Sequence, residues 1–290
     1  MMNELLAWLY WNPPRDVFTI PIIDRPIAWY GLWFVFGFVV AYFLLIPMFE
    51  TRLQDLHKPS SRKIAFSLVD RLTWYMVLGT IIGARLGHVF FYDWHLYKHH
   101  LLDIFKIWEG GLASHGAALG IFLGLFFYQK RVSKDYHLTF LSLLDMIAVP
   151  AGFAACCIRI GNFFNQEILG VPSTLPWAIR FGDPIDGEPW IPRHPVQLYE
   201  ALFYLIVFVL LLWLWKKPAV RKSKGLLSGI FFLLVFSFRF FIEFLKMPQS
   251  TVFNESFLQA GQWLSVPYVV LGLTLIVLSL RNCRFRSTQV

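Results

Sequence analysis

The segment IRIGNFFNQEILG, residues 158–170, marks the point at which an apolar run of the chain gives way to a proline-rich polar stretch. Within it, Arg159, Asn162, Asn165 and Glu167 follow one another at intervals of three, three and two residues. An apolar run of this kind belongs in lipid, where a charged side chain costs several kcal/mol unless it reaches the interface or is paired. The segment therefore predicts either a membrane helix whose polar end reaches for water or a site for a polar ligand.

The composition of the whole chain supports the membrane assignment. Of its 290 residues, 57% are hydrophobic and 15% are charged, whereas soluble domains carry about 25% charged residues. The apolar residues fall in blocks of roughly twenty, the length of helix that crosses about 30 Å of hydrocarbon. We therefore expect an all-α polytopic membrane protein, a single transmembrane domain over residues 1–290, with seven spans at about 26–49, 72–92, 111–128, 138–160, 197–215, 226–244 and 263–280.

Basic residues predict the orientation of these spans. Fifteen Lys and Arg residues lie in the loops after the first, third, fifth and seventh spans, and seven lie on the opposite side. Because cytoplasmic loops carry the excess of Lys and Arg, the C-terminus is expected in the cytoplasm and the N-terminus on the outer face. The net charge of +8 is thus explained by topology and indicates no nucleic acid partner.

Two polar regions are expected on the outer face. Residues 163–196 contain six prolines, too many for another span, and are expected to form a small extracytoplasmic head. Residues 1–25 suit a short amphipathic segment that lies at the membrane interface.

No motif of a metalloprotein or of a nucleophilic enzyme is present in the sequence. The three cysteines show neither a disulfide framework nor the spacing of metal ligands. Cys156 and Cys157 are adjacent within an apolar run, where the pKa of a thiol rises and the group is inert. We therefore expect no metal site and no covalent cysteine mechanism.

Two arginines lie near the outer boundary of the predicted spans, Arg159 in the fourth and Arg239 in the sixth. Arg239 and Glu243 are four residues apart, so they can form an ion pair on one helix face that only holds the bundle together. The other interpretation is that two arginines without an equal number of carboxylates bind an anion. In a membrane the obvious anion is a phospholipid head group, which guanidinium binds bidentately.

Two further residues at helix starts have a structural and a chemical interpretation. His115 follows a glycine-rich approach, and such a histidine is more often a boundary residue than a catalyst, although its ordinary pKa of about 6.5 suits a general base. Tyr30 is more often a tyrosine of the aromatic belt. Glycines at helical spacing favour close helix packing over a groove for acyl chains; they are Gly79, Gly83, Gly87, Gly116, Gly120 and Gly124.

The segment from Arg159 to Gly170 resembles the signature of the bacterial prolipoprotein diacylglyceryl transferases, Gly-Arg-x-Gly-Asn-Phe-x-Asn-x-Glu-x-x-Gly. Further blocks resemble family blocks in the same order and cover nearly the whole chain: Trp29-Tyr30-Gly31-Leu32, Gly83-Ala84-Arg85-Leu86-Gly87, Trp108-Glu109-Gly110-Gly111, His115-Gly116, Arg193-His194-Pro195-x-Gln197-Leu198-Tyr199-Glu200, Phe238-Arg239 with Glu243-Phe244, and Gly261-Gln262-x-Leu264-Ser265-x-Pro267. The chain departs from the pattern at Ser114, Ala117, Ile158, Val235 and Lys246.

The resemblance implies a seven-helix, multi-pass protein of the bacterial inner membrane, surrounded by membrane lipids. Its implied activity moves the diacylglyceryl group of phosphatidylglycerol to the lipobox cysteine in the signal peptide of a prolipoprotein, and releases glycerol phosphate. No metal or organic cofactor is implied. The alternatives are another phospholipid-processing transferase, a non-catalytic lipoprotein- or lipid-binding paralogue, and a transporter of an anionic solute.

The chemistry of this transfer suggests roles for the charged residues. Breaking the glycerol C–O bond places negative charge on the departing phosphate, and donors that bind this charge more strongly than the ground state accelerate the step. We expect Arg159 and Arg239 in this role, with Asn162 and Asn165 as neutral donors.

The remaining expected site residues orient these groups or act on the thiol. Glu243 and Glu167 are expected to orient the two arginines. His115 is expected to be the base on the incoming thiol, with Tyr30 as a nearby hydroxyl partner. On the resemblance, two glycines join the substrate site: Gly116 and Gly170.

Overall fold

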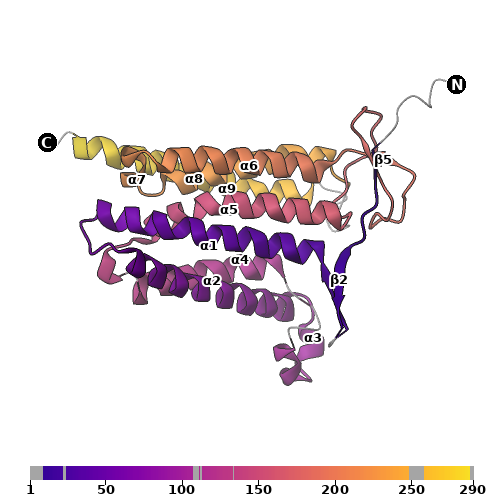
Figure 1. Ribbon diagram of the computed structural model, residues 1–290, viewed down its shortest axis with the longest axis horizontal. Helices are drawn as coiled ribbons and strands as arrows, with labels where there is room; N and C mark the ends of the chain where they lie inside the picture. The colour runs from indigo at the N-terminus through magenta and orange to yellow at the C-terminus, as the bar shows by residue number, and fades with distance from the viewer. Residues whose placement is uncertain are drawn as a thin grey trace. The chain divides into compact units, whose positions relative to one another are not determined.

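The computed structural model describes residues 9–21, 24–106, 111, 113–132, 134–247 and 258–287. The helices of this part of the chain are α1 (Trp29–Asp55), α2 (Arg62–Phe91), α3 (Trp94–Tyr97), α4 (Ser114–Arg131), α5 (Phe140–Phe164), α6 (Val196–Trp215), α7 (Pro218–Lys222), α8 (Leu226–Ile242) and α9 (Ala260–Ser287). Three short 3-10 helices are η1 (Leu101–Phe105), η3 (Lys134–Tyr136) and η4 (Glu243–Leu245). The strands are β1 (Leu9–Trp11), β2 (Asp16–Ile20), β3 (Arg25–Ala28), β4 (Ile179–Phe181) and β5 (Pro192–Arg193) (Figure 1).

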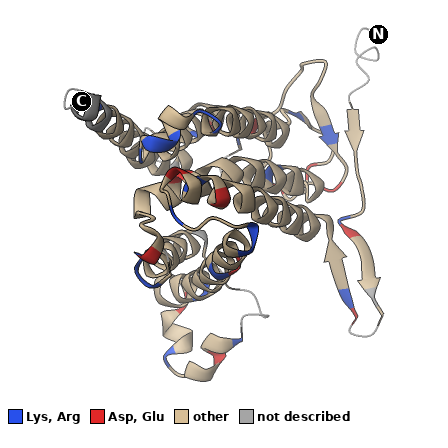
Figure 2. Ribbon diagram, turned by 60° about the vertical axis from the view of Figure 1, so that its left-hand side comes forward, with Lys and Arg blue, Asp and Glu red and all other residues tan. Residues whose placement is uncertain are grey.

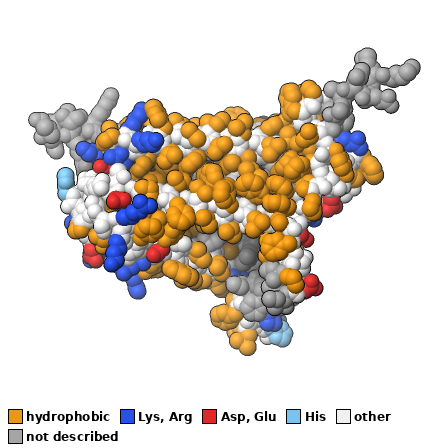
Figure 3. All heavy atoms as spheres, in the orientation of Figure 1, with side chains coloured by type: hydrophobic (Ala, Val, Ile, Leu, Met, Phe, Trp, Pro, Cys, Tyr) orange, Lys and Arg blue, Asp and Glu red, His pale blue; other side chains and the backbone are white. Residues whose placement is uncertain are grey.

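Six of the described helices are long and apolar enough to cross a membrane: α1, α2, α5, α6, α8 continued through η4, and α9. In hydrocarbon a helix satisfies its own backbone hydrogen bonds, which is why these apolar runs fold as they do. Hydrophobic side chains cover much of the surface over the long helices in the face drawn in Figure 3. The chain is therefore a mostly helical, multi-pass membrane protein.

The expected third span corresponds to α4. Its 18 residues rise about 27 Å, which is close to the thickness of the hydrocarbon core. Among the helices that the structure describes, α4 is not one of the six apolar enough by composition. The count of seven spans stays a prediction.

Two of the expected spans lie in helices that extend beyond the expected bounds. The second span was expected from residue 72, but α2 begins at Arg62, because the hydroxyl of Ser61 accepts a hydrogen bond of 3.2 Å from the backbone N–H of Ile64 and caps the helix. The fourth span continues past residue 160 to Phe164. The head therefore begins after this residue, and Arg159 lies inside a helix.

The expectation of an all-α fold is wrong in the polar segments. β1 pairs in parallel with β4, and β4 pairs antiparallel with β5. β2 and β3 form an antiparallel pair in what was expected to be an amphipathic segment. Prolines exclude a helix in these segments, and strand pairing satisfies the backbone groups instead.

The chain divides into two compact units, residues 1–41 with 147–290 and residues 42–146. In the first unit α8 packs on α6 and α9, and in the second α2 packs along α4. A Cβ atom added at Gly120 or Gly116 would collide with the backbone carbonyl of Gly79 or Gly83. These glycines therefore serve close helix packing, which confirms the favoured interpretation of their spacing.

Candidate functional site

The signature segment ends one helix and continues as a strained turn. Arg159 and Asn162 lie three residues apart near the end of α5 and share a face of it. In the turn that follows, Gln166 and Ile168 have positive φ values of 53° and 56°. Such values are uncommon outside glycine, and for a β-branched residue they are outliers. Strain of this kind persists only where the surroundings hold the turn in place.

Three hydrogen bonds of side-chain amides hold this turn. Gln166 is 0% exposed; its Nε2 donates to Oδ1 of Asn12 (3.2 Å), and its Oε1 accepts from the backbone N–H of Asp183 (2.8 Å). Nε2 of Gln197 in α6 donates to the carbonyl of Glu167 (2.7 Å). Sequence reasoning gave no role to either glutamine, although both stand inside motifs that were recognised.

A chain of hydrogen bonds runs from Arg159 along the signature. Nη1 of Arg159 donates to Oδ1 of Asn162 (3.1 Å), and Nδ2 of Asn162 donates to Oε1 of Glu167 (2.7 Å). Nδ2 of Asn165 also reaches Oε1 of Glu167, at 3.5 Å. The contact of Glu167 with Arg159 is therefore relayed by Asn162, and the side-chain amides of Asn162 and Asn165 both meet Glu167.

The carboxylate that pairs directly with Arg159 is Glu200, which sequence reasoning missed. Its Oε2 lies 3.1 Å from Nε of Arg159, and its Oε1 lies 3.0 Å from Nζ of Lys246 and accepts from the hydroxyl of Tyr204 at 3.1 Å. Glu200 is 0% exposed. The available signal was a carboxylate near the start of an apolar span, where an ionised group requires a partner.

Glu243 does not pair with Arg239 as expected. α8 ends at Ile242, and Glu243 opens the 3-10 turn η4, in which residues three apart align. Oε2 of Glu243 accordingly lies 3.4 Å from Nζ of Lys246. Among the residues that the structure describes, none forms an ion pair or a hydrogen bond with the half-buried side chain of Arg239.

The charged residues that surround Glu200 form a cluster, and the expected excess of arginines over carboxylates is not found in it. Three cations stand beside three carboxylates: Arg159, Arg239 and Lys246, with Glu167, Glu200 and Glu243. Burial lowers the pKa of Lys246, and the charges of Arg159 and Arg239 add to this effect, whereas Glu200 and Glu243 oppose it. Arg239 therefore acts electrostatically on the cluster without being neutralised by a direct contact within the described residues.

Tyr30 and Gly170 belong to the same unit as the cluster. A Cβ atom at Gly161 would come within 2.9 Å of the Tyr30 ring, so this glycine allows α1 to approach α5 two residues from Arg159. Gly170 forms an isolated β-bridge with Lys246, and a Cβ atom there would collide with the carbonyl of His194. The role of Gly170 is thus close backbone packing beside Lys246.

The second unit contains His115 and Gly116. The exposed ring of His115 lies 5.4 Å from that of Phe91 and 5.7 Å from that of Tyr92, measured between centroids. In the part of the chain that the structure describes, no carboxylate or hydroxyl contacts its ring. Gly116 is accounted for by its packing on α2, and the motif residues Trp108–Gly110 and the side chain of Ser114 lie outside the description.

Arg85, another charge of the predicted spans, is a structural anchor. Its guanidinium donates to the carbonyls of Asp103 (2.6 Å), Ile104 (2.8 Å) and Gly111 (3.3 Å). It also lies over the ring of Tyr97, 5.0 Å from the centroid. These contacts hold η1 and Gly111 against α2.

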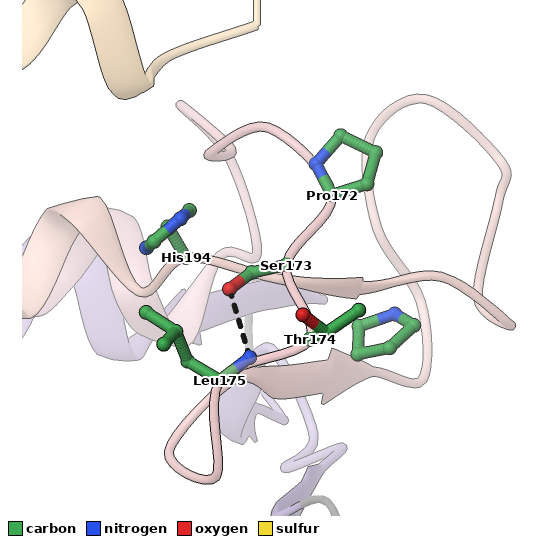
Figure 4. Close-up of a pocket in the computed structure, with 6 residues that line it drawn as sticks. Pro172, Ser173, Thr174, Leu175 and His194 are labelled. Atoms are coloured by element: carbon green, nitrogen blue, oxygen red, sulfur yellow. Dashed lines mark hydrogen bonds between the residues drawn. The ribbon is translucent and has the colours of Figure 1, made fainter. Parts of the chain in front are cut away.

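Two hollows lined by described residues lie outside the charged cluster. One, of about 430 Å³, is lined in the head by Pro172, Ser173, Thr174, Leu175, Pro192 and His194 (Figure 4). The other, of about 520 Å³, follows the apolar surface along α2 and α4. Within the described residues, no group of three or more His, Cys, Asp or Glu side chains is placed to hold a metal ion.

Comparison with known proteins matches nearly the whole chain to a single family. The family model described as prolipoprotein diacylglyceryl transferase matches residues 17–278. A phosphatidylglycerol–prolipoprotein diacylglyceryl transferase of Protochlamydia amoebophila is 40% identical, over 95% of this chain and 96% of its own length. Proteins of the same name from Porphyromonas gingivalis and Chloroherpeton thalassium are 40% and 39% identical, and each alignment covers at least 96% of both chains.

Proposed function

Because the chain belongs to the prolipoprotein diacylglyceryl transferase family, it acts as a phosphatidylglycerol–prolipoprotein diacylglyceryl transferase, and we propose that the cluster around Glu200 is where this reaction takes place. The observation that carries the proposal is Arg239. Burial lowers the pKa of Lys246 and the positive charge of this guanidinium lowers it further, but no carboxylate among the described residues pairs with Arg239. A half-buried cation of this kind is available to an anionic ligand.

The family and the charge of the cluster support phosphatidylglycerol and a prolipoprotein as the substrates. The thiolate of a lipobox cysteine attacks the carbon of the diacylglyceryl group that is bonded to the phosphate oxygen of phosphatidylglycerol. A C–S bond forms, the C–O bond to phosphate breaks, and glycerol phosphate leaves with the electron pair, while the thiol proton passes to a base. Arg159 and Arg239 bind the charge that develops on the phosphate, with Asn162 and Asn165 as neutral donors.

The base on the thiol is proposed to be His115, with Tyr30 as a hydroxyl partner. A free thiol of pKa near 8.5 is mostly protonated at neutral pH, so the reaction requires proton removal. Histidine is the side chain that most often acts as a general base.

We further propose seven spans, with α4 as the third, in the bacterial inner membrane. The N-terminus and the head would lie outside and the C-terminus in the cytoplasm. The positive-inside rule supports this orientation. An example is the segment between α6 and α8, which contains α7 and is rich in Lys and Arg (Figure 2).

The activity is tested with phosphatidylglycerol that carries one label in an acyl chain and another in the head glycerol. Purified protein in lipid nanodiscs is incubated with this lipid and a lipobox peptide. We expect equal amounts of acyl label on the peptide, as a thioether, and of head label released as glycerol phosphate. Release of head label without peptide modification would indicate another phospholipid-processing enzyme, and no turnover a binding protein; either result contradicts the proposal.

A further inference from the structure

Glu200 connects three elements of the first unit through one carboxylate. Its own position is near the start of α6. Oε2 meets Arg159 from α5, and Oε1 meets Lys246, the residue that follows η4. The remaining contact, from the hydroxyl of Tyr204, comes one turn along α6.

The stability of the folded protein does not by itself explain why the carboxylate of Glu200 is buried. An ionised carboxylate that is 0% exposed must be paired, and here two cations and a hydroxyl surround it. A buried ionic group of this kind is nevertheless weak evidence for stability, because apolar residues of similar volume are often as stable or more so. The group therefore has to be explained by what it does to its partners.

Its effect on Arg159 is to hold one edge of the guanidinium. Nε faces Glu200 at 3.1 Å, while Nη1 is bonded to Asn162 at 3.1 Å, and two held nitrogen atoms fix the plane of this rigid fork. The contact with Oε2 is an ion pair that is not aligned as a hydrogen bond.

We propose that Glu200 is a positioning residue, which holds the guanidinium of Arg159 in the orientation that receives the departing phosphate. The inference rests on the function proposed above for Arg159. A donor that is already oriented needs no reorganisation when the charge develops, whereas a displacement of about 1 Å can cost about 10²-fold in rate.

A different role is conceivable from the same contacts, in which Glu200 only neutralises Lys246 and so keeps the protein folded. The two roles differ in whether the effect of Glu200 is transmitted through Arg159. A double-mutant cycle separates them, because only coupled residues give non-additive losses.

The cycle combines Glu200→Gln with Arg159→Ala, and glutamine keeps the size of the side chain but removes its charge. Single-turnover transfer from labelled phosphatidylglycerol to a lipobox peptide is measured with enzyme in excess. We expect Glu200→Gln to lower the rate about 10²-fold when Arg159 is present and less than about two-fold in Arg159→Ala. An equal loss in both backgrounds would overturn the inference.

Lys246 provides the second arm of the test. The variant Glu200→Gln/Lys246→Met removes both buried charges and restores the charge balance. It is expected to stay as slow as Glu200→Gln alone, and recovery of the full rate would show that neutralising Lys246 was the role. Glu200→Asp keeps the charge at a shorter reach and is expected to regain part of the rate.

An ion pair in the head of the same unit provides the control for effects on folding. Asp186 is paired at 2.5 Å with Arg193, which is buried like Arg159. Asp186→Asn removes a carboxylate from a buried arginine outside the cluster, and its transfer rate per folded molecule is expected to stay within about two-fold of the wild-type rate. If Arg159→Ala keeps its activity, the proposed role of Arg159 fails; if it is slow while Glu200→Gln is not, only the inference about Glu200 fails.

Discussion

The carboxylate of Glu200 is completely buried and lies 3.1 Å from Nε of Arg159. Through this contact the start of α6 meets the end of α5, and Lys246 joins them from beyond α8. The charged cluster is therefore assembled from helix ends that are far apart in the sequence. Each of its charges can be changed separately, and the expected results differ.

Arg159→Ala is expected to lower kcat for diacylglyceryl transfer by at least about 10²-fold, because it removes a donor that acts on the developing phosphate charge. Arg159→Lys keeps the charge but loses the planar guanidinium, and its kcat should lie between those of the wild type and of Arg159→Ala. The measurement is steady-state transfer to a lipobox peptide. Arg15→Ala, which breaks an exposed ion pair with Asp183, is the matched control with expected wild-type kinetics; wild-type kcat in Arg159→Ala would contradict the role.

Lys246→Arg is expected to extend activity to higher pH. The pKa of Lys246 is lowered first of all by burial, so in the folded protein its proton is lost at a lower pH than from an ordinary lysine. Once it is neutral, the charge around the phosphate site is more negative, and the KM for the anionic lipid should rise. Arginine stays protonated, so the rise in KM should be absent from Lys246→Arg up to about pH 10; identical KM profiles would contradict this explanation.

His115→Gln is expected to lower transfer at pH 7 by about 10²-fold or more, because a general base typically contributes this much. The remaining activity should increase with pH, as the thiol of pKa near 8.5 ionises by itself. Full activity of the variant across pH 6–9 would show that another group accepts the proton.

Gly120→Ala is expected to destabilise the second unit, because the added Cβ would collide with the backbone carbonyl of Gly79. Gly31→Ala is the matched control, since a Cβ atom there meets nothing within 4 Å. In a helix this control should be neutral or stabilising by about 0.5–1 kcal/mol. Thermal unfolding in detergent compares the two, and an unchanged Tm for Gly120→Ala would argue against tight packing of α2 on α4.

The sequence was sufficient to predict a mostly helical, multi-pass membrane protein and to single out the polar segment that carries Arg159, because hydrophobic length and boundary charges are local properties. The pairing of charges was not predictable in the same way. Glu243 was assigned to Arg239 by helical spacing, but the helix ends one residue earlier and the 3-10 turn directs it to Lys246. Glu200 was missed because its two cationic partners come from other elements, and no spacing along the chain encodes such a contact.

The strands were missed for a related reason. β1 pairs in parallel with β4 across most of the chain, and a three-residue strand has no periodicity of its own to recognise.

The most direct test of the proposed site is the transfer rate of Arg239→Ala. Since no carboxylate of the described residues pairs with Arg239, its removal leaves no buried charge without a partner, and the variant should fold and melt as the wild type does. We expect transfer from phosphatidylglycerol to the lipobox peptide to fall by about 10²-fold or more at an unchanged Tm. Wild-type transfer by folded Arg239→Ala would contradict the assignment of this cluster to the phosphate.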